Sequence, residues 1–404
     1  MREGVRRATV DARAARVIVL NSVSPLEKEQ AGLVNVLGRV LADDVTAENG
    51  IPSFDTASTA GYALISSDTT GASRSEPRPL SVLSETASQT TLVEPGTLVP
   101  VREGEVLPRG ADAVVGARSA YRTPREPEVL VMAQCMPWDN VTRAGSSIRA
   151  GTLILSRGSV VGPGEAALLA RIGHAAVPVT RRSRVGVITT GANVVEVADR
   201  LAPGEGRNSA RYWLLGMVLA ANCELGRLMH VREGRIGIER AISECVGCDA
   251  VVLALGHGER HDSALDAIAH LGSLRFERML MEPAPACAFG MIGSIPVFVV
   301  PADYVLEGFE ALVRPGLMAL MGRSDVERPN VKSRLQSTLR TDPGACHYER
   351  ACTSYGDEGY VSVPINARDS GLEPWNQPNS LIIVPENIET ARRGSLVDVM
   401  LLVD

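Results

Sequence analysis

From Arg184 to Arg323 the sequence alternates short apolar runs with helical segments. The runs VGVITT, ELGRLMHV, DAVVLAL and IPVFVV have the length of strands. Helical patterns begin near Asn208, Ile236, Ser263 and Tyr304. This alternation predicts an α/β domain with a mostly parallel, doubly wound sheet. In such sheets ligands bind beyond the carboxyl ends of the strands, so we expect a site at that edge.

The segments on either side of this region have different residue patterns. Leucines in residues 25–45 recur with helical spacing, which predicts a helix. Residues 51–138 contain short β-branched runs broken by Gly, Pro, Ser and Thr, which predicts a β-rich insertion. Pro163 and Gly173 are typical start and stop signals for a helix over residues 164–172. After the linker SDVERPN, the last residues predict a small all-β domain.

Composition excludes several classes of protein. With 45% hydrophobic and 22% charged residues, the chain falls in the globular range, and no apolar run reaches the ~18 residues of a membrane span. The opening MREGVRRATVDARAARVIVL predicts an amphipathic helix rather than an export signal, because charges interrupt it and no cleavage site follows. The net charge of -6 is spread along the chain without a basic stripe, so we expect no nucleic-acid partner.

Seven cysteines are an odd number, which argues against a secreted disulfide framework and for a cytoplasmic protein. Cys245 and Cys248 form a lone C-x-x-C at the end of a helix, without a second pair at metal-site spacing. Buried thiols packed against a sheet are favoured over a zinc or redox site. We therefore predict no metal-binding residues.

The stretch DAVVLALGHGERHDS predicts a buried strand, a glycine turn and a helix. Gly256 and Gly258 allow a tight turn, and Asp262 or Ser263 is expected to cap the helix. Such a turn presents N–H groups and a positive dipole end to an anion. The alternative is a solvated loop. Candidate acid–base residues on this loop are His257, Glu259, Arg260, His261 and Asp262.

Two further strand ends point to the same edge. TTGAN, residues 189–193, follows VGVI, and VPADY, residues 300–304, follows IPVF. Three loops on one edge predict a pocket more strongly than any one of them. Apart from Asp303, the side chains that these two loops add are small or neutral, whereas pockets for phosphate chemistry usually supply charge.

Several ordered motifs resemble one family across nearly the whole chain. They include IPSFDTASTAGYAL, GEVLPRGADAVV, RGSVVGPGEAALLARIGHAAVPVTRRSRVGVITTG, EPAPACAFG and IPVFVVPADY. The chain resembles the molybdopterin molybdenumtransferases of the MoeA type, which include the E domain of gephyrin. The resemblance implies a homodimer with a helical or extended dimerisation domain (residues 1–46 and 141–181), an inserted β-rich domain (47–140), a doubly wound molybdopterin-binding domain (182–323) and a C-terminal β-barrel-like domain (327–404).

The resemblance also implies a reaction and its cofactors. Enzymes of this family take adenylylated molybdopterin and molybdate, use magnesium, release AMP and insert the metal into the dithiolene. That chemistry needs carboxylates for magnesium, and lysines or arginines for phosphate.

This sequence departs from the family at the charged positions. The acid of the family's Met-Asp-Gly-Tyr-Ala is Ala60, and the two acids of its Thr-Gly-Asp-Glu are Ala192 and Asn193. Its Lys-Pro-Gly-Lys-Pro is Glu282 to Ala286, which loses two cations and gains an anion. Losing one electrostatic group commonly costs about 10²- to 10³-fold in rate. The carboxylates that would hold magnesium are thus largely absent.

Turn and packing residues remain where charge does not. We predict ligand contacts, from the resemblance and the strand ends, at Gly61, Tyr62, Thr190, Gly191, Asn208, Gly256, Gly258, Pro301, Asp303 and Arg350. Three hypotheses follow. The favoured one is a catalytically silent, dimeric paralogue that binds a molybdopterin-like ligand or a protein partner. The others are an active insertase with an atypical site and a repurposed enzyme that uses the loop of residues 257–262.

Overall fold

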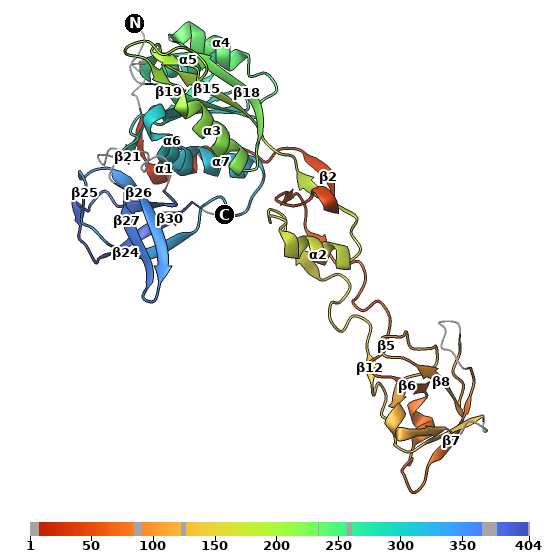
Figure 1. Ribbon diagram of the computed structural model, residues 1–404. Coiled ribbons are helices and arrows are strands. Elements are labelled where there is room, and N and C mark those ends of the chain that lie inside the picture. The colour runs from red at the N-terminus through yellow and green to blue at the C-terminus, as the bar shows by residue number, and fades with distance from the viewer. Residues whose placement is uncertain are drawn as a thin grey trace. The chain divides into compact units, whose positions relative to one another are not determined.

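The computed structural model describes residues 8–84, 91–122, 127–232, 234–256, 261–365 and 378–402. The chain forms two compact units (Figure 1). Unit 1 comprises Met1–Asp43, Arg157–Gly162 and Ala176–Asp404, and unit 2 comprises Asp44–Ser156 and Pro163–Ala175. Within the described ranges, no helix is long and apolar enough to cross a membrane.

The centre of unit 1 is a six-stranded sheet in the order β18-β15-β19-β23-β22-β20. The first four strands are parallel, and β22 and β20 extend the sheet through antiparallel pairs. The strands are β15 (Arg184–Thr190), β18 (Glu224–Val231), β19 (Ala250–Leu255), β20 (Ser273–Phe276), β22 (Ala288–Ile292) and β23 (Ile295–Pro301).

Helices cover both faces of this sheet. Val252 and Ala254 of β19 pack into one hydrophobic cluster, and Val251 and Leu253 pack into another. The first cluster contains side chains from α1, α3, α6 and α7, and the second contains side chains from α4 and α5. Because both faces are buried, the strand is a continuous apolar run. The predicted α/β character is confirmed. The helices are α1 (Ala12–Ser22), α3 (Ser209–Ala220), α4 (Arg235–Ser243), α5 (His261–Leu271), α6 (Val305–Gly308), a π-helical segment (Phe309–Val313) and α7 (Arg314–Leu320).

Unit 1 also contains a closed five-stranded barrel. β26 pairs with both β27 and β28, and the ring closes in the order β26-β27-β24-β30-β28. Figure 1 labels β24, β26, β27 and β30. Buried hydroxyls of Ser333, Thr353, Ser362 and Ser380 form hydrogen bonds of 2.6–2.7 Å to one another. The strands are β24 (Asn330–Leu335), β26 (Cys346–Gly356), β27 (Gly359–Pro364), β28 (Ser380–Val384) and β30 (Leu396–Leu401); β25 (Leu339–Arg340) pairs with β29 (Thr390–Ala391), and β21 (Arg278–Glu282) joins β26 to β1 (Thr9–Asp11).

The helix predicted for residues 25–45 is wrong. This segment forms β2 (Lys28–Gly32), a short 3-10 turn (Leu33–Asn35), β3 (Val40–Leu41) and β4 (Val45–Thr46). β2 and β3 both pair with β14 (Ala176–Thr180), a segment more than 130 residues away. Gly38 has a φ of +73° and ends any regular helix there. Long-range strand pairing therefore overrides the local leucine spacing.

Unit 2 is rich in strands. Its main sheet has the order β10-β11-β7-β8-β6-β9, and β5 pairs separately with β12. In β6, a Cβ at Gly61 would lie 2.0 Å from the Val115 carbonyl oxygen, so close strand packing requires glycine at this position. The elements are β5 (Thr56–Ala57), β6 (Gly61–Leu64), β7 (Arg78–Val82), β8 (Thr97–Val101), β9 (Ala113–Gly116), β10 (Ala120–Arg122), β11 (Glu128–Val131), β12 (Val141–Thr142), β13 (Leu153–Leu155) and α2 (Pro163–Arg171).

The Cys245 and Cys248 thiols are buried against two strands of unit 1, as the sequence favoured. Gly186 of β15 and Gly226 of β18 leave the room that these sulfur atoms fill. Burial raises the pKa of the Cys245 thiol to about 12, which keeps it protonated. The pair therefore packs as small apolar groups.

We predict that Gly186→Ala destabilises the protein by about 1–3 kcal/mol, because the new Cβ would lie 2.6 Å from Cys245 Sγ. Adding Cys245→Ala should recover part of this loss, since it removes the sulfur atom. Gly216→Ala in α3 is the matched control, because no atom lies within 4 Å of that Cβ. Urea unfolding measures the free energy of unfolding of all three variants. Equal losses for Gly186→Ala and Gly216→Ala would contradict the packing explanation.

Candidate ligand site

The carboxyl ends of β15, β19 and β23 border a small cavity of about 110 Å³ in unit 1. Because these strands are parallel, their ends and the N-terminus of α3 meet at one edge of the sheet. The lining residues are Thr189, Thr190, Val194, Arg207, Asn208, Ser209, Ala210, Gly256, Ala302 and Asp303. Four of them, Thr190, Asn208, Gly256 and Asp303, are predicted ligand contacts.

Asn208 is the buried centre of this cavity wall and caps α3. Its side-chain oxygen accepts a hydrogen bond from the Arg211 backbone nitrogen at 3.2 Å. Its Nδ2 donates to Thr189 Oγ1 at 2.9 Å. The Asn208 side chain is therefore held in one orientation, and the first N–H groups of α3 are left to face the cavity.

His230, at the end of β18, belongs to the same hydrogen-bond network. Its Nδ1 lies 3.0 Å from Thr189 Oγ1, and its Nε2 lies 3.2 Å from the Gly191 carbonyl oxygen. A neutral ring with hydrogen on Nε2 satisfies both contacts. We did not predict His230 from the sequence. His230 lies beside Thr189 because of the parallel register of β15 and β18. That register is set by the tertiary structure, so the sequence pattern alone does not indicate it.

Two glycines bring the strand ends close together. Gly191 has a φ of +146°, and a Cβ there would lie 2.8 Å from Val194 Cγ2. A Cβ at Gly256 would lie 2.1 Å from the Thr190 carbonyl oxygen. The Gly256 backbone nitrogen is 3.3 Å from Thr190 Oγ1. Larger residues at either position would push the two loops apart.

The loop of residues 257–262 is only partly described. His257, Gly258, Glu259 and Arg260 lie outside the described residues, so their predicted roles stay predictions. α5 begins at His261, and His261 Nε2 lies 3.0 Å from the Ala286 carbonyl oxygen. The expectation that Asp262 or Ser263 caps this helix is wrong, because both lie inside its first turn. In that turn, the negative charge of Asp262 is favourable, because the N-terminal end of the helix dipole is positive.

Arg350 of β26 connects the barrel to the cavity rim. Its Nε and one terminal nitrogen bind the two carboxylate oxygens of Glu307 at 2.6 and 3.1 Å. The same terminal nitrogen lies 3.4 Å from the Asp303 carbonyl oxygen, and the guanidinium carbon lies 5.0 Å from the Trp213 ring centre. Arg350 therefore sits near the predicted site but is held by a buried carboxylate.

The other predicted contacts lie in two places. Pro301 is the last residue of β23, directly before Asp303 and the cavity. Gly61 and Tyr62 are in β6 of unit 2. Their part in binding stays a prediction.

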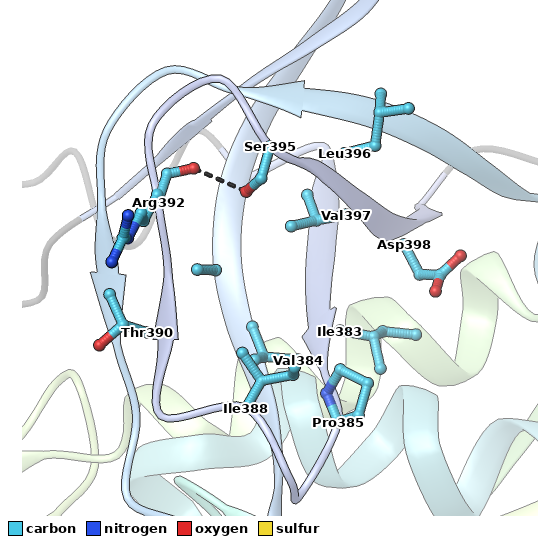
Figure 2. A pocket seen from close by; sticks show the side chains of 11 residues that line it. Ile383, Val384, Pro385, Ile388, Thr390, Arg392, Ser395, Leu396, Val397 and Asp398 are labelled. Atoms are coloured by element: carbon cyan, nitrogen blue, oxygen red, sulfur yellow. Dashed lines mark hydrogen bonds between the residues drawn. The ribbon is translucent and has the colours of Figure 1, made fainter.

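A larger cavity of about 430 Å³ lies in the barrel (Figure 2). Its walls are mainly apolar, with Ile383, Val384, Ile388 and Val397 among them, and Figure 2 places Arg392 and Asp398 on opposite sides. None of the predicted site residues that the structure describes lines it. It is therefore separate from the strand-end cavity.

Comparison with known proteins shows which proteins this chain is similar to. Residues 10–173 match the family described as "MoeA N-terminal region (domain I and II)". A molybdopterin molybdenumtransferase of Bacillus subtilis (strain 168) is 26% identical over 93% of this chain and 90% of its own length. Molybdopterin molybdenumtransferase 2 of Mycobacterium tuberculosis is 27% identical over 91% of this chain and 93% of its own.

Solved structures agree across the full chain. A MoeA molybdopterin biosynthesis protein from Pyrococcus horikoshii matches with a TM-score of 0.87 and 25% identity, over 98% of this chain and 100% of its own. The chain therefore has the fold of a MoeA protein. Its α/β architecture and closed barrel are those of a MoeA fold.

The departures from the MoeA pattern can now be located. Ala192 and Asn193 follow β15 directly beside the cavity, where the family pattern has two acids. Ala284 is fully buried, and the Ala286 carbonyl oxygen lies against His261. Asp303 is the single carboxylate among the described residues that line the cavity.

Magnesium takes oxygen ligands, usually one or two carboxylates together with water and substrate phosphate. In the part of the chain that the structure describes, no group of three or more His, Cys, Asp or Glu side chains could hold a metal ion. Among the described lining residues, only Asp303 could offer a carboxylate to the magnesium that the family resemblance implies.

We predict that Arg350→Met costs about 3–5 kcal/mol, because it leaves Glu307, whose side chain is 2% exposed, as a buried charge without its guanidinium. The double variant Arg350→Met/Glu307→Gln should be more stable than the single variant. Thermal unfolding of both measures this order. A double variant that is less stable than the single variant would contradict the view that the Arg350–Glu307 ion pair stabilises the edge of the cavity.

The pH dependence of stability offers a second test, at Glu349. Burial raises the pKa of this carboxyl, and the nearby charge of Glu307 raises it further. A raised folded-state pKa favours folding at low pH, and this contribution is lost as pH rises through the folded-state value. Glu349→Gln should therefore be more stable than the parent at pH 8.

The stabilising effect of Glu349→Gln should vanish below the ordinary glutamate pKa of about 4.3, where both side chains are neutral. Denaturant titrations at several pH values measure the difference. Glu358→Gln, at an exposed turn, is the control. A gain that does not change with pH would contradict the assignment to Glu349 ionisation.

Proposed function

We propose that this protein is a cytoplasmic MoeA homodimer that binds a molybdopterin-class ligand with its phosphate at the strand-end cavity and does not insert molybdenum. One observation carries the proposal. The backbone part of the cavity is complete, with a capped helix N-terminus and two close glycine turns, while its carboxylates are reduced to Asp303 among the described lining residues.

The retained backbone features favour binding of an anion. The N–H groups at the start of α3 carry the positive end of the helix dipole, which attracts phosphate. Arg207 adds a cation to the lining, although one of its terminal nitrogens already donates to the Glu196 carbonyl oxygen at 2.7 Å. The start of α3 and Arg207 can thus attract the phosphate of a ligand, although the two lysines of the family's Lys-Pro-Gly-Lys-Pro are absent here.

The missing carboxylates argue against metal insertion. Magnesium-assisted chemistry needs a metal ion fixed by ligands beside the reacting groups. Ala60, Ala192 and Asn193 stand where the family pattern has acids. Because losses of this kind reduce the rate by orders of magnitude, we propose binding without turnover.

We predict that the full chain binds adenylylated molybdopterin but releases no AMP above the rate without protein, with molybdate and magnesium present. A molybdopterin molybdenumtransferase serves as the positive control. Ala60→Asp alone should not restore release, because Ala192 and Asn193 remain. Sedimentation of the same sample should give twice the mass of the chain. AMP release near the control's rate would mean that the protein is an insertase with an atypical site.

Ser209→Asp locates the binding. An acid at the first turn of α3 suits the helix dipole, so the fold is preserved, but it repels an anion in the cavity. Ser209→Asn is the matched neutral control. Loss of binding in the Asp variant only would support the cavity, and equal binding by both would place the ligand elsewhere.

A further inference from the structure

Unit 2 has a cavity of its own, of about 410 Å³. Small-molecule sites usually have volumes of about 300–1,000 Å³. Three segments of unit 2 line it: Phe54 and Asp55 before β5, the loop from Val106 to Ala111, and Trp138 before β12. The cavity combines two aromatic rings with one carboxylate and one guanidinium.

The two rings are exposed although the backbone beside them is fixed. Phe54 is 56% exposed and Trp138 is 41% exposed. The Trp138 backbone nitrogen donates to the Asp112 carbonyl oxygen at 2.6 Å. The Asp55 carbonyl oxygen, next to Phe54, accepts from the Leu107 nitrogen at 2.8 Å. Apolar surface that is held in place but left uncovered is typical of a binding site.

Trp138 is also in a strained conformation. Its φ is +73°, a region that costs a bulky residue about 1–3 kcal/mol. The Arg143 guanidinium carbon lies 3.6 Å from the centre of its ring and covers one face. Trp138 lines the cavity, whereas Arg143 does not. The indole is therefore held ready to contact a flat group.

The two charged side chains have unused bonding capacity. Asp55 Oδ1 accepts from the Ala144 nitrogen at 2.6 Å and lies 3.4 Å from Arg143 Nε, and Oδ2 has no hydrogen-bond partner among the described residues. The Arg109 guanidinium likewise makes no hydrogen bond or ion pair within the described part of the chain. The cavity thus offers one acceptor for a ring N–H and one cation for an anionic group.

We propose that this cavity binds a purine nucleotide, with the ring against Phe54 and Trp138 and the phosphate at Arg109. Stacking on an aromatic side chain contributes about 1–3 kcal/mol per base and suits any planar heterocycle. Asp55 Oδ2 accepts from the amino edge of the ring, and Arg109 binds phosphate through paired N–H groups. The site lies within unit 2 and does not depend on the function proposed for unit 1.

Calorimetric titration of the full chain with guanosine 5′-monophosphate tests the proposal, with guanosine and ribose 5-phosphate as partial ligands. We expect the nucleotide to bind more tightly than either part. Arg109→Gln should weaken nucleotide binding about tenfold, the loss of one charge-assisted contact, and leave guanosine binding unchanged. Arg118→Gln, at an exposed position of the same unit, is the matched control.

Trp138→Leu should weaken both guanosine and the nucleotide and leave ribose 5-phosphate unchanged. Ser209→Asp in unit 1 should have no effect on any of the three, which separates this site from the strand-end cavity. The proposal is overturned if the nucleotide shows no saturable binding at millimolar concentration. It is also overturned if Arg109→Gln and Arg118→Gln bind the nucleotide equally well.

Discussion

The parallel pairing of β15 with β18 on one side and β19 on the other is the constraint on which the candidate site depends. The register sets Thr189 beside both His230 and Ala254, so three strand ends arrive at one edge. A shift of one residue would turn these side chains to the opposite face. Burial of both faces by helices fixes the register, because each face requires its own apolar residues.

Charge in unit 1 serves the architecture more than the cavity. Glu307 binds Arg350, and Glu310 binds Arg328 through two hydrogen bonds of 3.0 and 3.1 Å. At a partly buried position, Asp249 accepts two hydrogen bonds from Arg181. The strand-end cavity itself is lined mostly by backbone and small polar groups. This division is the physical basis for proposing ligand binding without metal chemistry.

Sequence patterns predicted the elements whose burial is local and regular. The apolar run of β19 and the start and stop signals of α2 agree with the structure. Residues 25–45 did not follow their leucine spacing, since β2 pairs with a strand far along the chain. His230 was missed for the same reason, because a polar residue at a strand end gains its meaning from its neighbours. The role of Glu307 was also not predicted, because nothing near it in the sequence indicates that it binds Arg350.

The sequence by itself determined the similarity to MoeA proteins, the α/β character and the uncharged residues at Ala60, Ala192 and Asn193, because these follow from residue identity and order. Only the tertiary structure decided which groups meet. Strand register joins Asn208, Thr189 and His230, and packing of the barrel against α6 joins Arg350 to Glu307. Such contacts depend on the folding of distant segments, and no local pattern in the chain encodes them.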